Sequence, residues 1–423
     1  MFKKITLPNG LRIVFVPGSF GSRTVTVLAL VGTGSKYETK EINGISHFLE
    51  HMYFKGTKKK PTSLAVAETM DKLGGVFNAF TSEEYTGYYA KVASNNFETA
   101  LEWVADIYLN SLLPPQEIEK ERHVITEEIN MISDTPMLYI SEVWKKLLYG
   151  DQPAGWDIAG SKENVASISR QQLLDYMNSQ YVASNTVVCV SGGPSLLKSV
   201  KGVKKYFASL RTSTNKEKPL VFEGQTKPQV SVHFKETDQT HLILGVRTFY
   251  DVFHPQKQTA ELLAAILGGM MSSRMFDQIR EKLGLAYYVR TSSESDTDTG
   301  YLSTMAGVDN SRVEKAIVNI LKEYKKIAET KVSLTELKKA KDNLKGRLAL
   351  SLESSDAKAF FYAGQELLEK KIITMEEIFK NIDKVSSSNI LKVAKSIFRS
   401  ERLNLALIGP FKDKDKFQKL LKL

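Results

Sequence analysis

The chain contains an internal repeat, which limits the folds that its 423 residues can adopt. The segments GYYAKVASNNFETALEWVADIYLN, from Gly87, and GYLSTMAGVDNSRVEKAIVNILKEY, from Gly300, both have the pattern of a strand, a polar turn and an amphipathic helix. A second pair of segments, NTVVCVSGGP and RLNLALIGP, ends at Pro194 and Pro410. The two offsets, 300 − 87 = 213 and 410 − 194 = 216, nearly agree. Two distant markers that keep their spacing predict two copies of one domain.

The predicted fold class is α+β, because strands with alternating apolar residues are followed by helices and then by further strands in each copy. Each copy is expected to form a mixed or antiparallel sheet with helices packed on one face. The polar stretch 212–219 lacks apolar periodicity and ends in a proline, so it predicts a linker between domains at 1–211 and 220–423. Apolar periodicity predicts helices over Ser63–Leu73, Gln116–Ile132, Gln258–Leu267 and Ser333–Leu350.

Composition excludes several classes of protein. The net charge is +10, but the lysines are scattered and no nucleic-acid recognition motif accompanies them, so no nucleic-acid partner is expected. The single cysteine, Cys189, stands in an apolar run and cannot form an internal disulfide. No window has the roughly twenty apolar residues of a membrane span. We expect a soluble cytoplasmic protein with no membrane partner.

The segment NGISHFLEHMYFKGT carries the strongest chemical signal. Ile45, Phe48, Leu49 and Met52 form one apolar stripe of a helix, which Gly56 is expected to end. Because the buried stripe holds one face of such a helix against the core, the polar side chains on its other faces point in fixed directions.

His47 and His51 lie four residues apart, so both imidazoles project from one side of that helix, about 40° apart. This spacing lets two nitrogens bind one tetrahedral zinc ion at about 2 Å. Glu50 is on the same side and precedes the second histidine, which makes the motif the inverted form of the H-E-x-x-H zinc helix. The alternative is two surface histidines beside a helix carboxylate.

A catalytic zinc ion needs a third protein ligand, and the segment QEIEKERHVITEEINMI offers one. Glu121 and Glu128 fall within its apolar stripe, whereas Glu127 shares a face with Lys120 and His123. Because an unpaired buried carboxylate is costly, Glu128 is predicted to be the ligand and Glu121 to orient a histidine or the ligand helix. Without the histidine pair, ion-paired helix carboxylates would explain these residues equally well.

These segments resemble the pitrilysin (inverzincin) family of zinc peptidases, which includes the mitochondrial processing peptidase. The family pattern is the inverted motif followed after a long gap by a glutamate, and 76 residues separate His51 from Glu128 (128 − 51 − 1 = 76). The resemblance covers essentially the whole chain. It implies one zinc ion per chain, held by His47, His51 and Glu128, with Glu50 as the general base. The charged linker departs from the glycine-rich linker of the family.

The segment VFNAFTS is predicted to be a strand from Val76 to Ser82. An extended peptide can add to an exposed strand edge through backbone bonds, and the resemblance implies that this strand binds substrate. The alternative is an interior strand that binds no ligand. The candidate substrate-binding residues are Asn78, Ala79, Phe80 and Thr81.

The second half has no H-x-x-E-H motif, so its copy of the domain is not expected to bind zinc in this way. Arg280 and Tyr287 have the spacing of the family's carboxy-terminal active-site pair. The resemblance implies that Arg280 binds a substrate carbonyl or carboxylate and that the Tyr287 hydroxyl stabilises an oxyanion. It also implies a homodimer, or a heterodimer with a related chain, that closes around a peptide like a clamshell.

The predicted function is a zinc-dependent endopeptidase that hydrolyses peptides or unfolded segments, with water activated by Glu50 as the nucleophile. The alternative is a catalytically inactive partner or scaffold subunit of such a peptidase. Loss of the zinc motif would favour that alternative, and the motif is present here.

Overall fold

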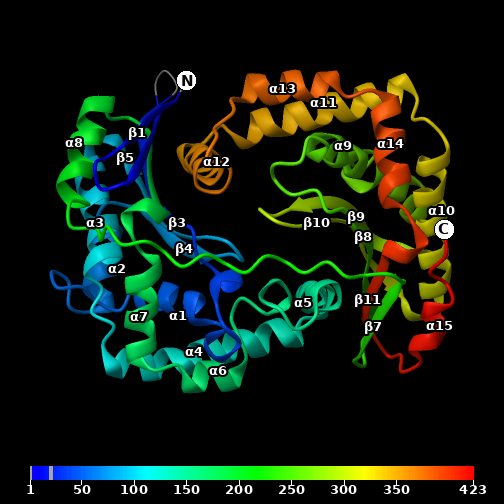
Figure 1. Cartoon of the computed structure of the whole chain (residues 1–423), viewed down its shortest axis with the longest axis horizontal. Helices are drawn as coiled ribbons and strands as arrows, with labels where there is room; N and C mark the ends of the chain where they lie inside the picture. Colours follow the sequence, from blue (N-terminus) through cyan, green and yellow to red (C-terminus); the bar gives the residue numbers. More distant parts are fainter. Residues whose placement is uncertain (1, 19–21) are drawn as a thin grey trace. The chain divides into compact units, whose positions relative to one another are not determined.

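The computed structural model describes residues 2–18 and 22–423, which form two compact units (Figure 1). The first unit contains the residues up to Asn130, Asp157–Pro219 and Leu350–Thr374. The second contains Met131–Trp156, Leu220–Ala349 and Met375–Leu423. Residues 212–219, the predicted linker, contain no helix or strand and end at the boundary between the units. Each half of the chain also contributes one segment to the other unit: Met131–Trp156 belongs to the second unit and Leu350–Thr374 to the first. The predicted domains, by contrast, are continuous ranges of sequence.

The first unit is built on a six-stranded mixed sheet with the order β1-β2-β6-β3-β5-β4. Strands β2 and β6 are parallel, and all other neighbours are antiparallel. The strands are β1 (Lys3–Thr6), β2 (Arg12–Pro17), β3 (Thr24–Val31), β4 (Val76–Thr81), β5 (Thr86–Ala93) and β6 (Thr186–Gly192).

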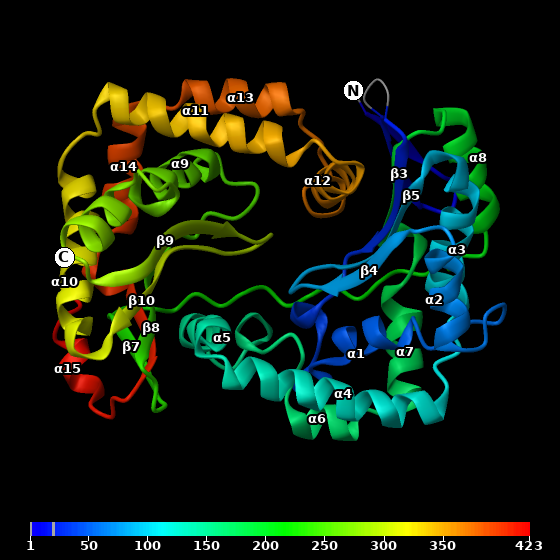
Figure 2. The same cartoon turned by 180° about the vertical axis from the view of Figure 1, so that it is seen from behind.

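Both faces of the central strands of this sheet are buried, as the nearly continuous apolar sequence of β3 requires. Val25 and Val27 belong to the core shared with helix α3 (Phe97–Asn110), whereas Leu28 and Leu30 belong to a separate core with helix α12 (Ser355–Leu368). Figure 2 shows α3 and α12 on opposite sides of β3 and β5. The other helices of this unit are α1 (Ile45–Met52), α2 (Ser63–Asp71), α6 (Lys162–Ser167), α7 (Arg170–Gln180), α8 (Leu196–Tyr206) and most of α4 (Pro115–Asp134).

The second unit repeats this plan with a five-stranded sheet of order β7-β11-β8-β10-β9, in which β7 and β11 are the parallel pair. Helices α9, α10 and α14 supply one core, and α5 packs on the other face. The strands are β7 (Gln229–Phe234), β8 (Gln239–Arg247), β9 (Ala286–Ser295), β10 (Gly300–Asp309) and β11 (Leu403–Gly409), and the helices are α5 (Pro136–Tyr149), α9 (Lys257–Gly268), α10 (Val313–Glu329), α11 (Leu334–Ser351), α13 (Met375–Lys384), α14 (Ser387–Ile397) and α15 (Lys414–Gln418).

The predicted α+β class with two repeated domains is confirmed. Strands β2-β6-β3-β5-β4 correspond in order to β7-β11-β8-β10-β9. Helix α5 starts at Pro136 and α12 at Ser355, an offset of 355 − 136 = 219 that is close to the repeat spacing. The two copies therefore exchange equivalent helices. The prediction placed helices on one face of each sheet, and the structure adds an exchanged helix on the other face.

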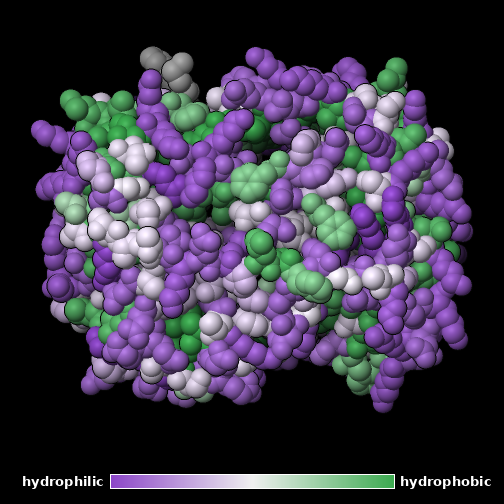
Figure 3. All heavy atoms as spheres, in the orientation of Figure 1, coloured by the Kyte–Doolittle hydropathy of each residue, from purple (hydrophilic) through white to green (hydrophobic). Residues whose placement is uncertain are grey.

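The four helices predicted from periodicity are confirmed, with ends that agree within two residues, as α2, α4, α9 and α11. No helix in the described part of the chain is long and apolar enough to cross a membrane. On the face seen in Figure 3, hydrophilic residues predominate and hydrophobic ones are scattered among them.

Cys189 provides a test of the exchanged helix. Its thiol is fully buried in the core that β6 shares with Ala359 and Ala363 of α12, and burial raises the pKa of this thiol far above its usual value. We expect the native protein to react with a thiol reagent at least about a hundredfold more slowly than the unfolded chain. The variant Ala363→Glu places a charge in this core, so it should loosen the packing of α12 and increase the rate at which Cys189 reacts. The helix signal in circular dichroism should change little. Rapid labelling of the native wild type would contradict this packing.

Candidate metal centre

Helix α1 carries three of the candidate site residues. Ile45, Phe48, Leu49 and Met52 are fully buried and hold one face of α1 against the core. The helix ends at Met52, four residues before Gly56, which was expected to end it. Gly56 has φ of 128° and completes the turns that follow.

The start of α1 is fixed by Glu38, a residue that the sequence analysis missed. Its buried carboxylate accepts hydrogen bonds from the backbone N–H groups of Gly44 and Ser46, both 2.8 Å, and from Asn43 Nδ2, 2.9 Å. Burial raises the pKa of Glu38, and these hydrogen bonds oppose that rise. The carboxylate satisfies free N–H groups at the positive end of the helix dipole and so holds the helix in place. The sequence does contain one indication of such a residue. Gly44 stands at the start of the helix and has no side chain to cap it, so another residue must accept the hydrogen bonds of the free N–H groups.

His47, His51 and Glu128 come together as one cluster. Their ligand atoms lie within 4.8 Å of one another. Glu128 Oε2 is 3.6 Å from His47 Nε2 and 3.5 Å from His51 Nε2. Ligand atoms at about 2.0–2.2 Å from a tetrahedral zinc ion are separated by about 3.3–3.6 Å. The two distances from Glu128 therefore fit a zinc ion that Glu128 shares with each histidine.

The second nitrogen of His51 is held by Glu121. Nδ1 of His51 is 3.0 Å from Glu121 Oε2, and Lys55 Nζ is 2.6 Å from Glu121 Oε1. This contact assigns the Nδ1 proton to the Glu121 side and leaves Nε2 facing Glu128 for a metal. Burial raises the pKa of Glu121, but the bonds from His51 and Lys55 outweigh burial and lower it.

The two histidines have opposite pKa shifts. Burial, followed by the charge of His51, lowers the pKa of His47 to about 4, so its imidazole is neutral and able to bind a metal at neutral pH. Burial also lowers the pKa of His51, but its bonds to Glu121 and Glu128 outweigh burial and raise that pKa to about 9. The bond with His51 lowers the pKa of Glu128, which keeps this carboxylate ionised and able to bind a metal.

Glu50 lies beside the cluster but is not part of it. The hydroxyl of Thr81 donates a 2.7 Å hydrogen bond to Glu50 Oε2. Burial raises the pKa of Glu50 above the usual value for a carboxyl group. A carboxylate with a raised pKa beside such a cluster suits proton transfer better than permanent ligation.

The predicted substrate strand is β4, which ends at Thr81, one residue before the predicted end. It is the outermost strand of its sheet and pairs, among the described strands, with β5 alone. Asn78 is exposed and its Oδ1 accepts a hydrogen bond from the backbone N–H of Ala79. Thr81 lies on the same side as Glu50, and Phe80 points to the opposite face, against α12.

Arg280 and Tyr287 lie in the second unit. Arg280 belongs to a π-helical segment, Phe276–Lys282, and its guanidinium stands 4.7 Å from the centre of the Phe276 ring. Tyr287 is the second residue of β9 and is 76% exposed. Both side chains are accessible to a ligand, while the metal cluster belongs to the first unit.

Comparisons with known proteins match this chain over nearly its whole length. The insulinase model of peptidase family M16 matches residues 15–161, and the model of the M16 inactive domain matches residues 167–344. An uncharacterized zinc protease of Bacillus subtilis, YmxG, is 37% identical over 413 residues, which cover 97% of this chain and 98% of the relative. An uncharacterized zinc protease of Rickettsia felis is 35% identical over 404 residues, which cover 96% of both chains.

Solved structures show the same fold. A protease from Helicobacter pylori has a TM-score of 0.90 at 24% identity and covers 97% of this chain and 99% of its own. An M16 inactive-domain protein from Pseudomonas fluorescens has a TM-score of 0.89 at 17% identity and covers 98% and 99%.

A repeated α+β domain with two histidines and a glutamate on one helix, and a further glutamate on a second helix, defines the class of the inverted-motif zinc peptidases. The chain belongs to peptidase family M16, the insulinase family. The predicted resemblance is thereby confirmed.

The opposite pKa shifts of the histidines predict how metal binding depends on pH. At pH 7 the metal-free protein should carry a proton on His51, whose pKa is about 9, but none on His47, whose pKa is about 4. Zinc binding at Nε2 of His51 must displace one proton. Affinity should therefore rise about tenfold per pH unit near neutrality and level off above pH 9.

Calorimetry in two buffers with different ionisation heats measures this proton release. We expect about one proton per zinc ion at pH 7. Glu121→Gln should lower the pKa of His51 and reduce the release at pH 8. Zinc binding at pH 7 without proton release would contradict this assignment of protonation states.

Proposed function

We propose that this protein is a zinc-dependent endopeptidase that acts on peptides and unfolded segments in an extended conformation. One observation carries the proposal: Glu50 lies beside the His47–His51–Glu128 cluster, whose ligand atoms are close enough together to hold one metal ion, and is not itself part of that cluster. Members of family M16 that are described as zinc proteases support it across 96–98% of their length.

The chemistry follows from the positions of the side chains. Bound zinc would supply a Lewis acid that polarises the scissile carbonyl and acidifies water. Glu50 accepts the proton of the attacking water and delivers it to the leaving amine. Its raised pKa favours both steps, because the carboxylate must gain and then release a proton near neutral pH. Thr81 holds the carboxylate in place through its 2.7 Å hydrogen bond.

Substrate binding is proposed at the outer edge of β4. The backbone groups of this edge can pair with an extended peptide regardless of its sequence. Because Thr81 ends β4 and contacts Glu50, a peptide bound along β4 would reach the general base. A folded substrate cannot offer a free strand, so unfolded chains are the expected substrates.

We further propose that the active form is a dimer, either of two copies of this chain or with a related chain, and that Arg280 and Tyr287 of one chain act at the metal centre of the other. The family resemblance and the accessibility of both side chains support this arrangement. Donors aimed at a developing oxyanion contribute about 3–4 kcal/mol, or about a hundred- to a thousandfold in rate.

Substitution of the general base separates catalysis from metal binding. Glu50→Gln should keep one zinc ion per chain and lose peptide hydrolysis by at least about a hundredfold, because an amide cannot accept the proton. Zinc content and turnover of a fluorogenic peptide mixture would be measured together. Glu127→Gln, on the exposed face of α4, is the control and should retain both properties. Wild-type turnover in Glu50→Gln would refute its role, and an inactive wild type with bound zinc would favour the scaffold alternative.

Mixing two inactive variants tests the shared site. Glu50→Gln and Tyr287→Phe should each be nearly inactive, but their mixed dimers contain one intact site. Random exchange should restore about a quarter of the wild-type activity, since half of the dimers are mixed and each has one working site of two. Exchange would be followed with labelled subunits. Proven exchange without recovery would contradict a site shared between chains.

A further inference from the structure

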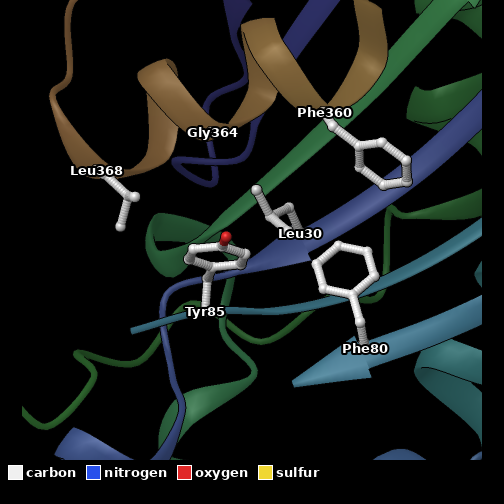
Figure 4. A pocket seen from close by; sticks show the side chains of 6 residues that line it. All are labelled: Leu30, Phe80, Tyr85, Phe360, Gly364 and Leu368. Atoms are coloured by element: carbon white, nitrogen blue, oxygen red, sulfur yellow. The ribbon is translucent and has the colours of Figure 1, made fainter. Parts of the chain in front are cut away.

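The first unit contains an apolar cavity of about 320 Å³ between its sheet and helix α12. Figure 4 shows α12 above the cavity and residues of the sheet below it. Most of the lining side chains are half-buried, so the cavity reaches the surface. The lining residues are Leu30, Phe80, Tyr85, Phe360, Gly364 and Leu368.

The aromatic wall of this cavity is held in place by its neighbours. Phe80 makes edge-to-face contacts with Phe360 and Tyr85, with ring centres 5.3 Å and 6.0 Å apart. It pairs across the sheet with Gly87, and a Cβ on Gly87 would lie only 2.3 Å from Phe80 Cζ. The glycine thus lets the Phe80 ring lie flat on the strand, at a fixed position.

Helix α12 leaves the space open at Gly364. A Cβ at this position would meet no atom within 4 Å. A glycine in the middle of a helix lowers helix propensity, and here its effect is to keep the cavity free of a side chain.

The cavity adjoins the strand that ends at the general base. Phe80 directly precedes Thr81, whose hydroxyl is 2.7 Å from Glu50. Successive side chains of a strand point to opposite faces. A peptide paired with the outer edge of β4 would therefore direct every second side chain to the face of the sheet that carries Phe80 and α12.

We propose that this cavity is a subsite for one large apolar or aromatic side chain of the peptide, within about three residues of the scissile bond, at 3.3 Å per residue along β4. The inference rests on the proposed peptidase function. The volume falls in the range of ligand pockets, roughly 300–1,000 Å³. No lining residue carries a charge, so a charged side chain would lose its hydration there without a partner.

Matched peptides test the subsite. A fluorogenic peptide series would place phenylalanine or alanine at each of three positions on either side of a fixed cleavage site. We expect the wild type to prefer phenylalanine by about tenfold or more in kcat/KM at one position. Gly364→Leu should fill the cavity and reduce this ratio towards one. Gly364→Ala fills less of the cavity and should reduce the phenylalanine preference only partly. It replaces the leucine variant in this test if that variant folds poorly.

Gly346→Leu is the matched control. Gly346 lies in helix α11, is exposed, and a Cβ there also meets no atom within 4 Å. This variant should keep the wild-type ratio. The subsite assignment is overturned if Gly364→Leu keeps the ratio, including the case in which it slows both peptides equally.

Binding separates this inference from the proposed function. Fluorescence anisotropy of the same labelled peptides on Glu50→Gln, with and without Gly364→Leu, needs no hydrolysis. A loss of the phenylalanine preference in the double variant supports the subsite even if the wild type cleaves nothing. The subsite is overturned if the double variant still binds the phenylalanine peptide more tightly than the alanine peptide. It is also overturned if Glu50→Gln alone binds the two peptides equally. Both results hold whether or not peptides are cleaved.

Discussion

Two histidines and three carboxylates meet where α1 and α4 contact each other, and each carboxylate has its own hydrogen-bond or ion-pair partner there. Glu121 is 96% buried and would be costly without its partners His51 and Lys55. The same contact turns Nε2 of His51 towards Glu128. Glu128 reaches both histidines, while Glu50 is turned to Thr81 instead. The proposed roles, Glu128 as a metal ligand and Glu50 as the general base, thus follow from the partner that each carboxylate has.

The scaffold holds these partners at the required distance. Helix α1 is fixed by its buried stripe and by the carboxylate of Glu38 at its start. The sheet brings Thr81 to Glu50 at the end of its outermost strand. The exchanged helix α12 covers the other face of that sheet and forms one wall of the apolar cavity beside β4. One sheet thereby positions both the proposed general base and the proposed side-chain subsite.

Much of the candidate metal centre and of the repeated fold can be predicted from the sequence, because the residue patterns that indicate them are local or periodic. The spacing of His47 and His51 follows from helix geometry, and Glu128 was chosen over Glu127 because it falls on the apolar stripe. In the structure Glu127 is exposed, and Glu128 faces the histidines. The repeat predicted two related sheets, and their strand orders agree.

Other features depend on contacts that periodicity does not encode. Glu38 reaches α1 through an irregular segment, so no helix or strand pattern linked the two. The exchange of α5 and α12 pairs segments that are distant in sequence, and the apolar stripe of a helix does not say which sheet it covers. The roles of Arg280 and Tyr287 remain a prediction from the family resemblance, since both are ordinary surface residues of the second unit.

The proposed chemistry depends on the binding of one zinc ion by Glu128 together with His47 and His51. Its most direct test is the zinc content and affinity of the wild type, Glu128→Gln and Glu127→Gln, measured by mass spectrometry and competition with a chelator. We expect one zinc ion per chain in the wild type and in Glu127→Gln, and a loss of affinity of at least about a hundredfold in Glu128→Gln. Equal affinity in the wild type and Glu128→Gln, or an equal loss in Glu127→Gln, would contradict it.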